Sequence, residues 1–189
     1  MSKGKILILS GPSGVGKGTV VQRMLEMAPN LTLSVSATTR APRQGEKNGV
    51  HYFYIDRTEF ERKIANGELL EYNRYGQNYY GTLKSFVDEK RAEGKNVLLE
   101  IDINGGRQVK QKCPDAITVF LTAPSADEIE RRLRERGTES EEQIRQRLEI
   151  ARCEMSRASE CDYVVCNDNV EYAAERILAI LAEKPVNEL

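Results

Sequence analysis

Short apolar runs alternate with amphipathic segments along most of the chain. Apolar runs predict strands at residues 5–10, 96–102, 117–121 and 163–166, and a further strand is expected at residues 31–36. Between these runs, apolar positions recur with the helical period, which predicts helices at residues 16–28, 83–93, 105–112, 126–133, 140–159 and 172–181. Strands that alternate with helices predict an α/β fold built on a parallel, doubly wound sheet flanked by helices.

The segment at residues 37–85 departs from this alternation. Residues 37–49 are rich in turn formers and carry no hydrophobic period, and such a long irregular connection indicates function. The rest of the segment predicts strands at residues 50–55 and 69–75, a helix at 58–66 and a tyrosine-rich turn at 78–82. We therefore expect a small α+β lobe inserted into the larger α/β unit.

Capping boxes mark the predicted starts of three helices, at Thr58, Ser125 and Ser140. The last two helices flank a break at residues 137–138. They carry many arginines: Arg131, Arg132, Arg134, Arg136, Arg145 and Arg147. The hairpin is either a solvated charged pair, because glutamates are interspersed, or a mobile lid whose arginines neutralise a transferring phosphoryl group. We favour the lid for about two or three of these arginines.

Length and composition limit the broad class of protein. The chain has 189 residues and a net charge of −1, which fits one domain and gives no electrostatic reason to expect nucleic acid or a membrane as partner. No apolar run could span a bilayer and no targeting peptide precedes the first strand, so we expect a cytoplasmic protein. The cysteines lack metal-ligand spacing, which predicts free thiols: Cys113, Cys153, Cys161 and Cys166.

The most informative stretch lies between the first strand and the first helix. Residues 9–19 read Leu-Ser-Gly-Pro-Ser-Gly-Val-Gly-Lys-Gly-Thr, the spacing of a phosphate-binding loop (P-loop). Glycines let backbone N–H groups surround an anion, the following helix points its positive end at the same place, and Lys17 adds a mobile charge. The pattern expects Ser or Thr directly after the lysine. Gly18 stands there instead, with the hydroxyl one place later at Thr19, and a glycine cannot ligate Mg²⁺ through a side chain.

Other polar residues could form a second anion site. Arg40 and Arg43 lie close together in the irregular connection, and two guanidinium groups can hold a phosphate distinct from the one at the loop. Tyr52, Tyr79 and Tyr80 could add hydroxyls or a stacking ring, although tyrosines in strands and turns more often serve packing. Together with the loop, these residues suggest a phosphate donor and a phosphate-bearing acceptor.

The sequence suggests specific roles for two carboxylates, Asp102 and Glu71. Asp102 ends a hydrophobic strand, where ligands of open α/β sheets bind, so it either holds Mg²⁺, directly or through water, or caps the following helix. Glu71 lies in a predicted strand of the inserted lobe, and a carboxylate accepts two hydrogen bonds side by side. The N1–H and exocyclic NH₂ of guanine match that pair, whereas adenine has an acceptor at N1. Spacing alone favours Glu71 no more than Glu68.

Five motifs, in order along nearly the whole chain, resemble those of the guanylate kinase family. They are Gly11-Pro12-Ser13-Gly14-Val15-Gly16-Lys17, Ser34-Val35-Ser36-Ala37-Thr38-Thr39-Arg40-Ala41-Pro42-Arg43, Asn78-Tyr79-Tyr80-Gly81-Thr82, Glu100-Ile101-Asp102 and Arg136-Gly137-Thr138-Glu139. The Thr-Thr-Arg-x-Pro-Arg stretch is highly specific to that family. The resemblance implies a P-loop nucleoside monophosphate kinase that transfers the γ-phosphoryl group of ATP to GMP, with Mg²⁺, giving ADP and GDP in purine nucleotide metabolism and GMP recycling.

The resemblance also implies the organisation of a single domain over residues 1–189. The core would span about residues 1–36, 86–125 and 151–189, the GMP-binding lobe about 37–85 and the helical lid about 126–150. ATP would be bound by Gly11, Pro12, Ser13, Gly14, Val15, Gly16, Lys17, Gly18, Thr19 and, at the adenine, Asn167. GMP would be bound by Ser36, Arg40, Arg43, Tyr52, Glu71, Tyr80, Thr82 and Asp102.

The resemblance assigns catalysis to five residues: Lys17, Arg43, Arg132, Arg136 and Arg147. Because Gly18 has no hydroxyl, we expect the ATP phosphates and waters to hold Mg²⁺, with no direct side-chain ligand and with Thr19 or a carboxylate in the outer shell. Thr82 stands where the family commonly carries serine, which keeps the hydroxyl.

Other functions stay open at this point. A scaffold-type protein-binding module would have lost the ATP site, whereas this chain keeps Lys17, Arg43, Glu71 and the lid arginines. A GTPase switch would fit the loose Asp-x-x-Gly pattern at residues 102–105, but the chain has no Asn-Lys-x-Asp motif. Another acceptor, such as AMP or CMP, is the nearer alternative. The oligomeric state, monomer or homodimer, is undecided.

Overall fold

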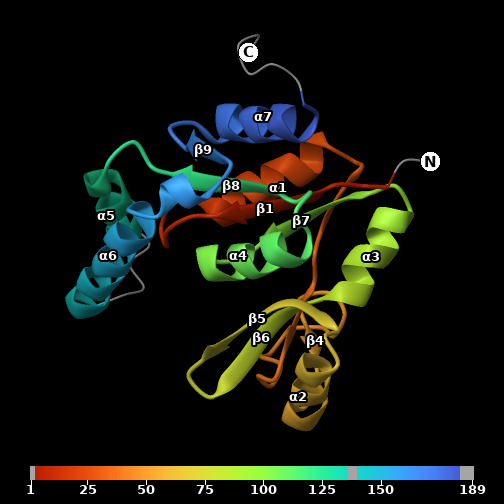
Figure 1. The fold of residues 1–189 in the computed structure, drawn as a ribbon. Coiled ribbons are helices and arrows are strands. Elements are labelled where there is room, and N and C mark those ends of the chain that lie inside the picture. The colour runs from red at the N-terminus through yellow and green to blue at the C-terminus, as the bar shows by residue number, and fades with distance from the viewer. Residues whose placement is uncertain (1–2, 136–139, 184–189) are drawn as a thin grey trace.

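A five-stranded parallel sheet lies at the centre of the computed structural model, which describes residues 3–135 and 140–183 (Figure 1). Its strands, in spatial order, are β2 (Leu31–Leu33), β7 (Asn96–Glu100), β1 (Ile6–Ser10), β8 (Ile117–Thr122) and β9 (Tyr163–Cys166). β1 occupies the middle, so the loop that follows it lies at the centre of the sheet's carboxyl edge. The predicted parallel α/β sheet is confirmed.

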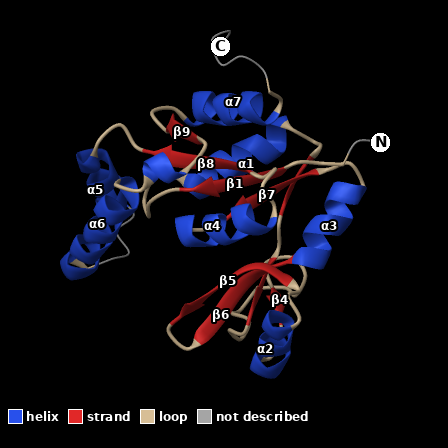
Figure 2. Ribbon diagram, in the orientation of Figure 1, coloured by secondary structure: helices blue, strands red, loops and turns tan. Residues whose placement is uncertain are grey.

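Helices cover both faces of this sheet (Figures 1 and 2). α1 (Lys17–Met27) and α7 (Val170–Leu181) pack against Leu7 and Leu9 of β1 in the main hydrophobic cluster. α3 (Lys84–Ala92) and α4 (Ile103–Lys112) pack with Ile6 and Ile8 in a second cluster. Successive β1 side chains thus enter opposite layers, which explains why this strand is continuously apolar.

A second, four-stranded sheet lies beside the first and below it in Figure 1. Its order is β4 (Phe53–Tyr54), β3 (Ser36–Thr38), β6 (Asn78–Leu83) and β5 (Leu69–Tyr75). α2 (Arg57–Ala65) packs on it through Phe60, which shares a small hydrophobic cluster with Ala37 and Leu69. The inserted segment therefore has a core of its own.

α5 (Ala126–Glu135) and α6 (Glu141–Met155) form a helical pair at one end of the central sheet, followed by a 3₁₀ turn at Ala158–Glu160 (Figure 1). The capping box at Ser140 is confirmed: its hydroxyl accepts from the N–H of Gln143, whose side chain accepts from the N–H of Ser140. Ser125 likewise accepts from the N–H of Glu128 at 3.1 Å. The pair joins the main core through Ile129 and Leu133.

The structure corrects the predicted strands at three places. The strand expected at 31–36 is two strands in different sheets, because the chain crosses between the sheets at residues 34–35. The turn expected at 78–82 is strand β6, paired on both sides with β3 and β5. Of the strand expected at 50–55, only Phe53–Tyr54 pairs in the sheet, and Val50 is 63% exposed.

Three smaller corrections concern ends and exposure. Asp56, rather than Thr58, caps α2 by accepting from the N–H of Glu59 at 2.8 Å. The helix expected to reach residue 159 ends at Met155. β9 is an edge strand with Tyr163 and Val164 exposed rather than a buried strand.

Candidate active site

The phosphate loop joins β1 to α1 at the carboxyl edge of the central sheet. Gly11 has a φ of 151°, and a Cβ there would lie 2.4 Å from the carbonyl oxygen of Leu121 in β8. Gly16, with a φ of 91°, is the N-cap residue of α1 and brings no side chain to the N–H groups of the first turn. Those N–H groups and the positive end of the helix are the elements that bind an anion.

Lys17 folds back over this loop. Its ammonium donates hydrogen bonds to the carbonyl oxygens of Gly11 at 2.5 Å and Pro12 at 3.2 Å. This places a positive charge at the rim of the loop, where phosphates of a bound nucleotide would lie. A Cβ on Gly18 would meet nothing within 4 Å, so space does not demand glycine there.

Two of the three predicted lid arginines contact the loop. Arg147 of α6 donates to the hydroxyl of Ser13 at 3.0 Å. Arg132 of α5 donates to the carbonyl oxygens of Val15 and Asn167, each at 3.0 Å. The third, Arg136, lies outside the described residues. The helical pair thus brings guanidinium groups to the loop from residues more than a hundred positions away in sequence.

Asn167 supports the other side of the loop. It is 2% exposed, and its Nδ2 donates to the carbonyl oxygen of Val15 at 2.8 Å. Its Oδ1 is buried and has no hydrogen-bond partner among the described residues, an arrangement that costs about 1–3 kcal/mol unless a ligand donates to it. A hollow of about 420 Å³ adjoins it, lined by Gly14, Gly16, Thr19, Arg132, Glu135, Asn167, Asp168 and Val170.

A second cavity, of about 260 Å³, is lined by residues of both sheets and their connections. The lining residues are Ser36, Tyr52, Glu71, Asn73, Tyr75, Tyr80, Gly81, Glu100, Ile101 and Asp102. Most of the predicted GMP-binding residues therefore come together here. Thr82 adjoins the cavity through its hydrogen bond to Glu71, and Arg40 adjoins it by packing over the ring of Tyr52 at 5.4 Å.

Glu71 is the buried carboxylate of this acceptor cavity. It is 5% exposed, and its Oε1 accepts from the hydroxyl of Thr82 at 2.7 Å. Burial raises the pKa of Glu71 to about 7; the Thr82 hydrogen bond and Lys112 oppose that rise, and Asp102 adds to it. Glu68 is partly exposed and forms an ion pair with Lys63 at 2.9 Å. The fold thus separates two glutamates that spacing could not distinguish.

Glu46 organises the arginine-bearing loop, and the sequence did not reveal it. It accepts from both Nη atoms of Arg40 at 2.9 and 3.0 Å, from the backbone N–H of Arg43 at 2.7 Å and from the hydroxyl of Tyr54 at 2.7 Å. The Arg40 guanidinium above all lowers the pKa of Glu46 to about 2. A carboxylate among turn formers gives no periodic signal, so only the fold shows that Glu46 contacts both predicted arginines.

Asp102 is a helix cap and also a bridge between the two sheets. Its Oδ1 accepts from the N–H of Gly105 at 2.7 Å, which confirms the cap, and its Oδ2 accepts from Asn73 at 3.1 Å and from the Tyr75 hydroxyl. Glu100 ends β7 opposite Leu9 of β1 and is exposed at the same cavity. The sequence pattern does not single out Glu100, because it is the last residue of the strand itself and its exposure is evident only in the fold.

The chain is similar over nearly its whole length to known proteins. A sequence model of the family described as guanylate kinase matches residues 3–184. The chain belongs to the guanylate kinase family. The guanylate kinase of Lactococcus lactis subsp. lactis (strain IL1403) is 50% identical over 179 residues, covering 95% of this chain and 87% of the relative. That of Synechococcus sp. (strain JA-3-3Ab) is 49% identical over 180 residues, covering 95% and 83%.

A solved structure also resembles this chain in its fold. The crystal structure of guanylate kinase from Anaplasma phagocytophilum matches with a TM-score of 0.74 and 36% identity, covering 96% of this chain and 86% of that one. Membership of the guanylate kinase family confirms the resemblance drawn from the five motifs and the predicted fold class.

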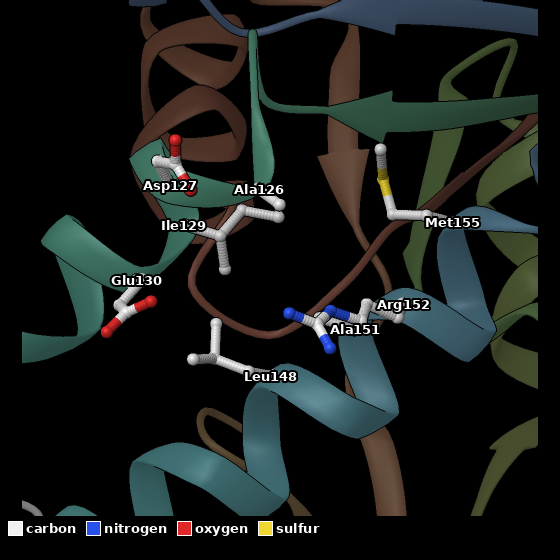
Figure 3. A pocket seen from close by; sticks show the side chains of 8 residues that line it. All are labelled: Ala126, Asp127, Ile129, Glu130, Leu148, Ala151, Arg152 and Met155. Carbon is white, nitrogen blue, oxygen red and sulfur yellow. The ribbon is translucent and has the colours of Figure 1, made fainter.

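One pocket of the protein lies apart from the predicted site residues. It has about 190 Å³ and lies between α5 and α6 (Figure 3). Ile129 and Leu148 face one another across it and the Arg152 side chain reaches in from α6, with Ala126, Ala151 and Met155 completing a largely apolar lining. Its walls offer little polar surface, so it does not resemble a phosphate site.

Within residues 3–135 and 140–183, no group of three or more His, Cys, Asp or Glu side chains is placed to hold a metal ion. No helix in those ranges is long and apolar enough to cross a membrane. The cysteines, all within this part of the chain, are unpaired: Cys113, Cys153, Cys161 and Cys166.

Proposed function

We propose that this chain transfers the γ-phosphoryl group of ATP to GMP, giving ADP and GDP, as members of the guanylate kinase family do. One observation carries the proposal: a phosphate loop and a cavity with a buried carboxylate meet at one sheet edge. The loop follows β1 and the cavity reaches the end of β7, its direct neighbour, with Leu9 opposite Glu100. Donor and acceptor phosphates bound at these places would face each other.

The donor side would hold ATP through the loop, residues 11–19. Its N–H groups and the start of α1 would surround the phosphates, and Lys17 would reach the terminal ones. Asn167 supports an adenine site, because an adenine amino group could donate to its unpartnered Oδ1. Arg132 borders the same hollow.

The acceptor side would hold GMP across the small sheet. Arg40, Arg43, Tyr52 and Tyr80 would bind its phosphate. Ser36, like Thr82, would be a hydroxyl partner at the guanine edge. Glu71 would accept from the N1–H and amino group of guanine, with Thr82 fixing the carboxylate and Asp102 lying beside it. The Glu46 carboxylate would hold the Arg40 guanidinium in place for that phosphate.

Transfer would need positioning and charge neutralisation rather than a general base. The attacking oxygen of the GMP phosphate is already anionic; it forms a bond to the γ-phosphorus while the bond to the bridging oxygen breaks and its electron pair leaves with ADP. Lys17, Arg43, Arg132, Arg136 and Arg147 would neutralise charge on the transferring group. Arg147 already contacts the loop at Ser13, which supports its role.

Mg²⁺ bound with ATP would supply positive charge that neutralises the phosphates during transfer. The chain's own groups fit the outer shell of such an ion, because Mg²⁺ held by phosphates keeps several waters to which a nearby carboxylate can hydrogen-bond. Glu100 is the better placed carboxylate, since both oxygens of Asp102 already accept hydrogen bonds from protein groups. Thr19 lines the hollow next to Asn167 and would contribute only to the outer shell.

We further propose that the chain works as one domain with moving parts. The core would comprise about residues 1–36, 86–125 and 151–189. The lobe at about 37–85 and the lid at about 126–150 would close over both substrates and exclude water, which limits wasteful hydrolysis of ATP. Superimposable structures with and without both nucleotides would contradict this motion. The cytoplasm, which supplies ATP and GMP and keeps thiols reduced, would be its compartment.

The test is to measure ADP release from ATP and Mg²⁺ with a panel of acceptors: GMP, AMP, CMP and IMP. The proposal requires turnover that depends on GMP and is far weaker with AMP and CMP. Preference for another monophosphate would change the acceptor, and absence of any acceptor-dependent turnover would favour a protein-binding module. Tight GTP binding with slow hydrolysis would favour a GTPase switch.

A further inference from the structure

The outer edge of β5 is covered by a side chain rather than by another strand. β5 is the last strand of the four-stranded sheet. Gln108 of α4 lies against its outer edge: Nε2 donates to the carbonyl oxygen of Tyr72 at 3.0 Å, and Oε1 accepts from the N–H of Tyr72 at 3.2 Å. A residue of a neighbouring strand would supply the same pair. Gln108 therefore completes the hydrogen bonding of β5 at the residue next to Glu71.

Gln108 belongs to one face of α4 that follows β5 around Glu71. Gly105, Gln108 and Lys112 share that face by their helical spacing. A Cβ on Gly105 would lie 3.0 Å from Oε2 of Glu71, and Lys112 donates to the carbonyl oxygen of Leu69 at 2.8 Å. α4 thus touches β5 before, at and after Glu71.

This support compensates for an irregular ladder on the other edge of β5. Leu69 pairs with Leu83 and Glu71 pairs with Thr82, so Leu70 is an extra residue in a bulge. Leu69 enters the core of the small sheet, while Leu70 belongs to the second cluster of the central sheet. A bulge disrupts the ladder at the extra residue, so β6 alone holds the backbone before Glu71 less firmly than a regular strand would.

We propose that Gln108 is a positioning residue of the guanine site, which holds the Glu71 carboxylate by fixing the backbone of Tyr72 to α4. The inference rests on the proposed role of Glu71 in binding GMP. Gln108 does not contact the acceptor; it acts through Tyr72. Recognition of the base would then depend on α4, whose first turn is capped by Asp102 in the same cavity.

The test compares Gln108→Met, which keeps the length of the side chain without its amide, with Gln111→Ala at an exposed position of the same helix. For Gln108→Met we expect the KM for GMP to rise about 3- to 10-fold, with kcat and the KM for ATP within about twofold of wild type. Preference for GMP over IMP, which lacks the exocyclic amino group, should fall by a similar factor. The amide of Tyr72 should exchange with solvent faster than in wild type.

A GMP KM and a GMP-to-IMP preference within about twofold of wild type, matching Gln111→Ala, would overturn the proposal. Equal losses for ATP and GMP, or a loss in kcat alone, would overturn it too, because either would indicate general loosening. If Gln108→Met does not fold, hydrogen exchange of the wild-type protein decides, since an unprotected Tyr72 amide contradicts the role. Wild-type protein without GMP-dependent turnover would contradict the proposed function instead, and would leave the Tyr72 exchange result unaffected.

Discussion

Thr82 donates a 2.7 Å hydrogen bond to Oε1 of Glu71, while Oε2 of the same carboxylate lies against Gly105 of α4. The carboxylate is therefore held between the small sheet and a helix of the central unit. Glu71→Gln keeps the shape but places an NH₂ donor where the guanine donors would point. We expect the KM for GMP to rise about 5- to 150-fold, because a mispaired buried polar group costs about 1–3 kcal/mol. The KM for ATP should change by less than about twofold, measured by varying each nucleotide in turn.

Glu68→Gln is the matched control for this substitution. Glu68 is also a glutamate at the start of the β5 region, but it pairs with Lys63 away from the cavity. Both KM values should stay near wild type in this variant. An equal loss for ATP and GMP in Glu71→Gln would show that Glu71 does not read the base.

The pKa of Glu71 makes GMP use depend on pH. Burial raises that pKa to about 7, so the free protein holds a protonated carboxyl below it. Only the ionised form can accept both guanine donors, and binding therefore favours proton loss. We expect kcat/KM for GMP to fall as pH drops below about 7, approaching about tenfold per pH unit. The measurement is a pH profile of kcat/KM.

The phosphate of GMP titrates near pH 6 as other phosphate monoesters do, so the profile needs a control. Glu71→Gln retains the titration of that phosphate but lacks the carboxyl. Its profile should keep a limb near pH 6 and lose the one near 7. Identical limbs in both proteins would assign the whole dependence to the substrate.

The contacts of Glu46 predict how its loss would affect binding of the acceptor phosphate. It holds Arg40 through both Nη atoms and also accepts from the backbone of Arg43. Glu46→Ala should release the Arg40 guanidinium and raise the KM for GMP about 10- to 100-fold, the scale of lost hydrogen bonds to charged groups. Glu89→Ala, at an exposed position of α3, should have no effect. A lower KM for GMP would instead mean that Glu46 competes with the phosphate for Arg40.

The fold was largely predictable because a parallel sheet covered on both faces makes its strands continuously apolar, as in β1. The prediction of strands failed where tertiary contacts determine the secondary structure. Residues 78–82 carry turn-like composition, yet pairing with β3 and β5 makes them a strand. The crossing at residues 34–35 leaves no mark in the hydrophobic pattern, because the strands on both sides of it, Leu-Thr-Leu and Ser-Ala-Thr, are too short to show separate patterns.

The residues of the candidate site also fall into two groups, those that local sequence spacing predicts and those that only the fold brings near their partners. Lys17 and the loop follow from local spacing, since their chemistry requires consecutive residues. Glu46, Glu100 and Gln108 do not, because each acts on partners that only the fold brings near. The choice of Glu71 over Glu68 likewise came from the family resemblance, and burial supplies the physical reason for it.

Gly18 allows a direct test of how Mg²⁺ is held. A side chain there would meet nothing within 4 Å, so Gly18→Ser should fold normally and place a hydroxyl where many phosphate loops have one. If the ATP phosphates and waters hold the ion, the hydroxyl replaces one water, and the half-saturating Mg²⁺ concentration should fall by less than about twofold.

Glu100→Gln should raise the half-saturating Mg²⁺ concentration about tenfold, because an outer-shell carboxylate loses its charge. Both are measured by titrating Mg²⁺ at fixed ATP and GMP, with Glu93→Gln on the exposed end of α3 as the control. A large fall in Gly18→Ser would show that the missing hydroxyl limits metal binding, and an unchanged Glu100→Gln would remove Glu100 from the metal's surroundings.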